Sequence, residues 1–169
     1  QTVAETTDPR PELPEVAPAE DLDPDPGTVH VHLIAAPDGE NYSYNAQHPG
    51  PLLAAPLHST LVVDFDNQLA AETTIHWHGI AAPEAMDGVV WLSQPIAPGG
   101  SFTYTIPLDH AGTFWYHPHV DVAQQVDRGL YGPLVVSDPA DPAVDQDRVL
   151  VFDAVGETTS TDDHALLDI

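Results

Sequence analysis

Short runs of alternating hydrophobic and polar residues recur along the middle of the chain. From Val29 to Ile34 the odd positions are aliphatic, which is the period of a β-strand with one buried face. Glycine, proline and asparagine separate the runs, as at Pro98, Gly99 and Gly100, where we expect a turn. The strands predicted in this way are residues 29–34, 61–65, 73–77, 101–106, 112–117 and 131–136.

Helical periodicity is nearly absent from the same region, and only residues 121–128 predict a short helix. Several short strands joined by turns, without a regular exchange of strands and helices, indicate an all-β domain. We therefore predict an antiparallel β-sandwich or Greek-key barrel formed by residues 28–138.

The two ends of the chain differ in composition from this β-rich part. Residues 1–27 contain eight acidic residues and six prolines, which predicts a disordered, solvated arm. Residues 139–169 predict a linker followed by one strand at 148–152. Because a single strand cannot bury its own faces, we interpret it as the first strand of a second domain that the chain lacks.

The charge of the chain is strongly unbalanced, with 27 Asp and Glu against three Lys and Arg and a formal net charge of −24. Binding to nucleic acid needs clustered basic residues, so nucleic acid is excluded as a partner, and an anionic membrane surface is disfavoured for the same reason. No apolar run approaches the roughly 18 residues that a membrane span needs. Salt screens such a surface, so we hypothesise a secreted, periplasmic or extracellular protein from a saline environment. An ordinary acidic secreted protein is the alternative.

Histidine carries the chemistry that the sequence suggests, since the chain has ten histidines and no cysteine. Three pairs have the spacing His-x-His, which on a strand places both imidazoles on one face. The pair His30 and His32 lies in a plain alternating run, so we expect solvent-facing side chains on an early or edge strand.

The other two pairs occur where predicted strands end, beside aromatic residues. His76 and His78 flank Trp77, and His117 and His119 follow Trp115 and Tyr116. Imidazole is a preferred neutral ligand of copper and zinc, and aromatic neighbours limit the access of solvent to a metal. Two strand ends that meet would hold four imidazoles in one cleft. The alternative is a pair of aromatic–histidine clusters without a metal.

These two motifs, TIHWHG at 74–79 and GTFWYHPH at 112–119, resemble the first two copper-ligand motifs of laccase-type multicopper oxidases. The resemblance covers about residues 29–138 and implies the amino-terminal, cupredoxin-like domain of such an oxidase. Other segments that fit are residues 44–51, 87–88, 94–95, 98–100 and 128–133.

The resemblance also implies individual roles within a trinuclear copper cluster. His76 would bind the type 2 copper, and His78, His117 and His119 would bind the type 3 pair. Asp87 would help to deliver the protons that the reduction of O2 consumes. The alternative for Asp87 is that it and Gly88 form only a turn.

In this family the remaining cluster histidines and the type 1 copper cysteine belong to the last domain, which this chain does not contain. The resemblance thus implies part of a laccase-like oxidase that reduces O2 to water while phenols, aromatic amines or metal ions are oxidised at a type 1 copper elsewhere. The partner would be the remaining oxidase domains, as a separate or cleaved chain, unless the chain is a truncated piece. A non-catalytic copper- or zinc-binding cupredoxin module is the alternative function.

Overall fold

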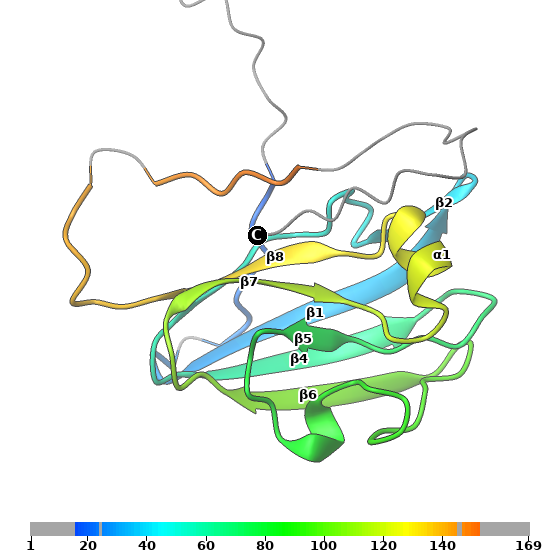
Figure 1. Cartoon of the computed structure of the whole chain (residues 1–169), viewed down its shortest axis with the longest axis horizontal. Helices are drawn as coiled ribbons and strands as arrows, with labels where there is room; N and C mark the ends of the chain where they lie inside the picture. Colours follow the sequence, from blue (N-terminus) through cyan, green and yellow to red (C-terminus); the bar gives the residue numbers. More distant parts are fainter. Residues whose placement is uncertain (1–15, 24, 145–146, 153–169) are drawn as a thin grey trace, which may run out of the picture.

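Two four-stranded β-sheets face each other in the computed structural model, which describes residues 16–23, 25–144 and 147–152 (Figure 1). This arrangement confirms the predicted all-β sandwich. The first sheet has the order β2 (Asn41–Tyr44), β1 (Thr28–Asp38), β4 (Thr60–Asn67) and β6 (Ser101–Pro107). The second sheet has the order β3 (Leu53–Pro56), β8 (Gly132–Ser137), β7 (Gly112–His117) and β5 (His76–His78). The loops contain the one-turn 3-10 helix η1 (Glu84–Met86) and the helix α1 (Val122–Asp127).

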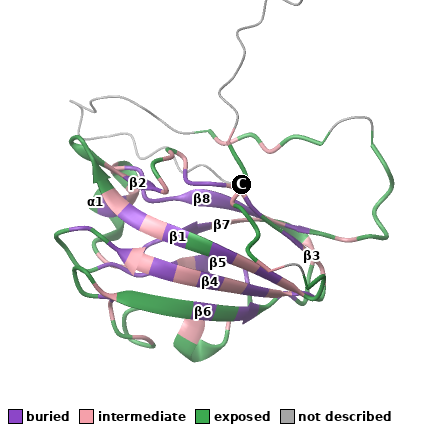
Figure 2. Ribbon diagram, turned by 180° about the vertical axis from the view of Figure 1, so that it is seen from behind, coloured by how far each residue is buried: buried purple, intermediate pink, exposed green. Residues whose placement is uncertain are grey.

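The core lies between the sheets and follows the alternation along each strand. In β4, Leu61, Val63 and Phe65 are buried, whereas the residues between them are partly exposed. Figure 2 shows buried positions alternating with intermediate ones along β4, and with intermediate or exposed ones along β1. From the second sheet, Trp77 and Tyr116 enter the core and are fully buried. Burial of each large apolar side chain contributes roughly 1.5–3 kcal/mol to folding.

Both sheets are mixed, and in this respect the prediction of an antiparallel sandwich was wrong. β1 pairs in parallel with β4, and β3 pairs in parallel with β8. The other pairs are antiparallel. The physical reason is that the chain crosses repeatedly between the sheets, so strands that follow each other in sequence often do not pair.

Some element boundaries differ from the sequence-based prediction. The short strands β2 and β3 were not predicted, and the strand expected at 73–77 is shifted to His76–His78. The short helix expected at 121–128 is present as α1. Residues 147–152 are not assigned to a strand in this structure, and the interpretation of 148–152 as the first strand of a second domain stays a prediction. None of the described helices is long and apolar enough to cross a membrane.

The described part of the acidic arm is attached to the domain. Leu52 exchanges backbone hydrogen bonds with Ala17 and Ala19, and the amide of Leu22 donates to the carbonyl of His30. Residues 1–15 of the predicted disordered arm lie outside the described residues.

β1 is an inner strand, so the edge position considered for His30 and His32 is wrong, although His32 is exposed as expected.

Candidate metal centre

The two histidine motifs are neighbours in space because β5 and β7 pair antiparallel. His76 lies opposite His117, and His78 lies opposite Trp115. Alternate residues of a strand point to opposite faces of the sheet, and Trp77 and its neighbour on β7 occupy the core face. The histidines therefore lie on the outer face of the second sheet, away from the core.

His119 follows the end of β7 and folds back over the same face. Its backbone amide donates a hydrogen bond of 2.9 Å to Thr74 Oγ1 in the chain leading to β5. Pro118, which separates the two histidines, has no amide hydrogen to continue the strand ladder. The side-chain oxygen of Thr74 thereby replaces a strand partner and fixes the position of the last histidine.

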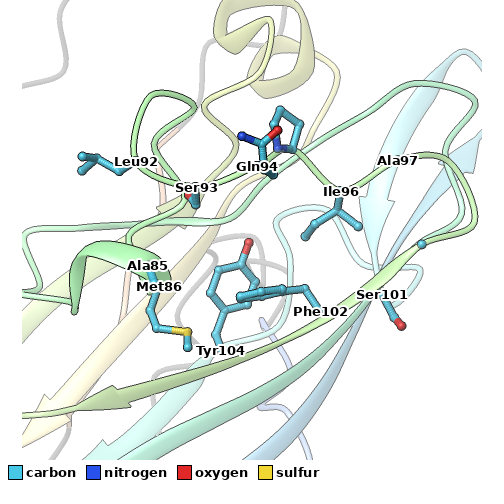
Figure 3. A pocket seen from close by; sticks show the side chains of 12 residues that line it. Ala85, Met86, Leu92, Ser93, Gln94, Ile96, Ala97, Ser101, Phe102 and Tyr104 are labelled. Atoms are coloured by element: carbon cyan, nitrogen blue, oxygen red, sulfur yellow. The ribbon is translucent and has the colours of Figure 1, made fainter.

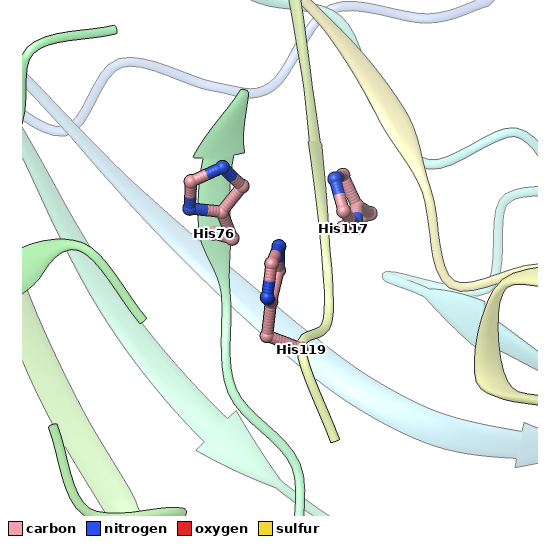
Figure 4. A group of neighbouring side chains, drawn as sticks. All are labelled: His76, His117 and His119. Carbon is pink, nitrogen blue, oxygen red and sulfur yellow. The ribbon is translucent and has the colours of Figure 1, made fainter. Parts of the chain in front are cut away.

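The four histidines form one cluster, three members of which are drawn in Figure 4. Side-chain nitrogens of His76, His117 and His119 all lie within 4.8 Å of one another. His78 joins the group because its Nδ1 lies 3.4 Å from His117 Nε2. The structure thus brings together all four histidines that the sequence singled out.

Backbone carbonyls determine which nitrogen of two rings is free. His76 Nδ1 lies 2.9 Å from the carbonyl oxygen of Asp87, and His117 Nδ1 lies 3.0 Å from that of Pro118. A carbonyl can only accept a hydrogen bond, so Nδ1 of each ring carries the hydrogen, and in the neutral form of each ring Nε2 carries the lone pair. On His117 this Nε2 faces His78 Nδ1, 3.4 Å away. Such outer hydrogen bonds orient histidines that bind metal ions.

His117 is buried although it lies on the outer face of the sheet. Trp115 stacks on its ring with 3.9 Å between ring centroids and 22° between planes, and His119 stacks on it at 5.2 Å. The pKa of His117 is lowered to about 4, mainly by burial and also by the neighbouring histidines, while the hydrogen bond to the carbonyl of Pro118 acts in the opposite direction. Burial also lowers the pKa of His119. At neutral pH both rings are therefore uncharged, which is the form that binds a metal ion.

Asp87 lies at the edge of the cluster. Its carboxylate Oδ2 is 3.6 Å from His76 Nδ1, and its side chain is 19% exposed. The loop that carries Asp87 is fixed to β5, because the indole of Trp77 donates a 3.1 Å hydrogen bond to the carbonyl of Met86. Gly88 packs directly on the backbone of Ile75.

Sequence reasoning named Trp115 only as an aromatic neighbour and Gly88 only as a possible turn residue, and it gave Thr74 no role of its own. In the structure Trp115 stacks on His117, Thr74 holds His119, and Gly88 allows the loop to approach β5. The position of Trp115 was detectable, because it precedes His117 by two residues and so shares its face. The contact of Thr74 depends on the fold and has no sequence signal of its own.

Comparison with known proteins places this centre in a family. The sequence model of a family described as multicopper oxidase matches residues 27–141 of this chain. Multicopper oxidase MmcO of Mycobacterium tuberculosis is 38% identical over 133 residues, which are 78% of this chain and 25% of the relative. Laccase-1 of Thanatephorus cucumeris is 45% identical over 119 residues, which are 63% of this chain and 20% of the relative.

Solved structures agree with these relatives. A multicopper oxidase from Pseudomonas thermotolerans is 44% identical, with a TM-score of 0.65 over 68% of this chain and 30% of that one. A metallo-oxidase from Campylobacter jejuni is 29% identical, with a TM-score of 0.72 over 76% of this chain and 30% of that one. These structures confirm the cupredoxin-like fold.

The chain spans a quarter or less of the length of these curated relatives. Within that span it contains the two paired strands and the four clustered histidines described above. The chain belongs to the multicopper oxidase family.

Proposed function

We propose that this chain is the amino-terminal domain of a laccase-like oxidase and supplies His76, His78, His117 and His119 to a trinuclear copper cluster. His76 binds the type 2 copper in this proposal, and the other three histidines bind the type 3 pair. A type 1 copper site in another domain would supply the electrons, taken from phenols, aromatic amines or metal ions.

The observation that carries this proposal is the pairing of His76 with His117 across β5 and β7. It gathers four imidazoles on the outside of a sheet, where a second protein surface can reach them. The donor set suits copper, because imidazole nitrogen is a good copper ligand. The carbonyls of Asp87 and Pro118 engage Nδ1 of His76 and His117, so Nε2 is the ligand atom of both rings in this proposal. Copper bound here would supply the one-electron chemistry for the reduction of O2 to water.

The side chains around the histidines have supporting roles in the proposal. The backbone carbonyl of Asp87 orients His76, while its carboxyl group, 3.6 Å from the same ring, would relay protons for the reduction of O2 in this proposal. Trp115 covers His117 and excludes water from that side of the cluster. The domain alone lacks a cysteine for a type 1 site, so activity requires the remaining domains.

Oxygen uptake by the assembled oxidase tests this function. His117→Ala should abolish uptake with a phenolic substrate, because it removes a buried member of the cluster. His110→Ala is the matched control, since His110 contacts the carbonyl of Gly79 and lies outside the cluster. Equal uptake by the two variants would contradict the proposed role of the cluster.

A further inference from the structure

The helix α1, which follows the histidine cluster in the chain, is held to the domain by a polar side chain. It begins at Val122, three residues after His119, and has six residues. Gln125 is the only buried residue of this helix and is 3% exposed. A helix this short is not stable alone, and most helices are placed by the burial of an apolar face. The position of α1 therefore depends on the contacts of Gln125.

Both ends of the Gln125 amide are bonded to the segment that leads into β5. Oε1 accepts a 2.7 Å hydrogen bond from the hydroxyl of Thr73, and Nε2 donates a 3.0 Å hydrogen bond to the carbonyl of Glu72. Thr73 is fully buried, and its backbone exchanges hydrogen bonds with that of Ile96. Ile96 in turn lines a groove between the loop of residues 85–97 and β6 (Figure 3). Thr73 is thus held by its backbone and by its hydroxyl.

The neighbouring residue Thr74 binds the last histidine of the cluster. Its hydroxyl accepts the hydrogen bond from the amide of His119, and its chain continues through one further residue to His76. Residues 72–74 therefore hold both His119 and α1. This double attachment sets the position of His119 relative to His76, although the two histidines are 43 residues apart in the sequence.

The turn between His119 and α1 has a strained backbone. Asp121 has a φ of 44° and a ψ of 51°, which is the left-handed region that residues other than glycine rarely adopt. Such a conformation persists only where the surrounding structure imposes it. The carbonyl of Asp121 accepts a 2.9 Å hydrogen bond from the amide of Gln125, so the anchored helix holds this turn. Release of α1 would let the turn relax and His119 move.

We propose that Gln125 is a positioning residue for the copper cluster. It acts through Thr73 and the adjoining bond of Thr74 to His119, without contact with a ligand, and this inference rests on the proposed function. An apolar side chain in place of Gln125 would leave the carbonyl of Glu72 without this donor. The hydroxyl of Thr73 would keep only its long contact of 3.4 Å with the carbonyl of Thr74.

Titration of the chain with Cu(II), followed by calorimetry and electron paramagnetic resonance, tests this inference. Gln125→Met keeps the length of the side chain and removes both hydrogen bonds. We expect the affinity for Cu(II) to fall at least about fivefold and the copper hyperfine splitting to change, because His119 is displaced. Gln124→Met makes the same substitution at an exposed position of α1 and should leave both at the native values. Native affinity and splitting in Gln125→Met would overturn the inference.

Two further variants separate positioning from a general loss of stability. Val63 is fully buried in the first sheet, so Val63→Ala should lower the free energy of unfolding and leave Cu(II) binding unchanged. Equal weakening of Cu(II) binding by Val63→Ala and Gln125→Met would overturn the inference. Thr73→Val removes the partner of Oε1, so the double variant Thr73→Val, Gln125→Met should bind Cu(II) as weakly as Gln125→Met alone. Fully additive losses would also overturn it.

The copper content of the assembled oxidase separates this inference from the proposed function. If His117→Ala loses copper while Gln125→Met binds Cu(II) as the native chain does, only the positioning role of Gln125 fails. If His117→Ala left the copper content unchanged, the proposed function itself would fail, whatever the behaviour of Gln125.

Discussion

Gly88 lies so close to the carbonyl group of Ile75 that a side chain could not fit between them. Its φ angle of +74° is also one that L side chains rarely adopt. Ile75 precedes His76 and Gly88 follows Asp87, so this contact presses the loop onto β5. It thereby brings the carbonyl of Asp87 to its hydrogen bond with His76 Nδ1.

Gly88→Ala should destabilise the domain more than the same change at a glycine with similar backbone angles and open space. Gly99 provides that control, because its φ is +72° and no atom lies within 4 Å of a Cβ there. We expect Gly99→Ala to lower the free energy of unfolding by about 1 kcal/mol and Gly88→Ala by at least about 3 kcal/mol. Urea unfolding measures both, and equal losses would show that the contact with Ile75 is unimportant.

Trp115 should influence copper binding without being a ligand. Its ring stacks on that of His117, and its ring centroid lies 5.1 Å from that of His78. Removal of the indole would therefore free both imidazole rings to reorient. Trp115→Ala should weaken the binding of Cu(II) at least tenfold in a calorimetric titration, as expected for a residue that orients ligands. Trp115→Phe keeps an aromatic face and should recover most of the affinity. Equal affinities for Ala, Phe and the native residue would contradict the role of the stack.

Asp87→Asn separates the two contacts that Asp87 makes with His76. The backbone carbonyl still accepts the hydrogen bond from Nδ1, so the copper content should stay unchanged. The variant cannot supply a proton from a carboxylic acid, so O2 consumption by the assembled oxidase should fall about 100-fold. Asp87→Glu should restore part of it. Full activity of Asp87→Asn would contradict a role in proton delivery and would mean that Asp87 only forms a turn.

Asp64 should make stability depend on pH in the acidic range. Its carboxylate accepts hydrogen bonds from Thr103 and His30, which lower its pKa from the ordinary value of 3.8. Because folding lowers the pKa of this carboxyl, its ionised form stabilises the fold at pH values above 3.8. This contribution is lost as the pH falls through the lowered pKa of the folded protein. Because Asp64 is about half exposed, Asp64→Asn should cost at most about 1 kcal/mol at pH 7.

The cost of Asp64→Asn should shrink as the pH falls below 3.8 and disappear below the lowered pKa of the folded protein, where the native carboxyl is protonated as well. Chemical unfolding at pH 7 and at the lowest pH where the fold persists measures the difference. Asp109→Asn, at an exposed position, is the control and should show little dependence. A cost that is the same at both pH values would contradict the role of the carboxylate.

The sequence alone was sufficient to predict most strands and the grouping of the histidines. Alternation along β1, β4 and β6 directly reports a buried and an exposed face, as in Leu61, Val63 and Phe65. The spacing of His76 and His78 predicts a shared face once their strand is recognised. Local patterns of this kind need no knowledge of distant contacts.

Features that depend on pairing between distant segments were not predictable. The parallel pairing of β1 with β4 follows from the path of the chain through the other sheet, which no local pattern encodes. The segment 148–152 has the composition of a strand but no described strand to pair with. The bonds of His30 to Asp64 and of His32 to Asp66 likewise join positions 34 residues apart. The hypothesis of a saline environment stays a prediction.

Native mass spectrometry of the protein as isolated from its source tests whether these histidines belong to a copper cluster. We expect the 18.1 kDa chain to travel with, or as part of, a larger polypeptide that carries about four copper ions. In the His117→Ala variant most of that copper should be lost, while His110→Ala should retain it. A free chain without copper, or an assembly whose copper content does not depend on His117, would contradict the claim that these histidines form part of a copper cluster.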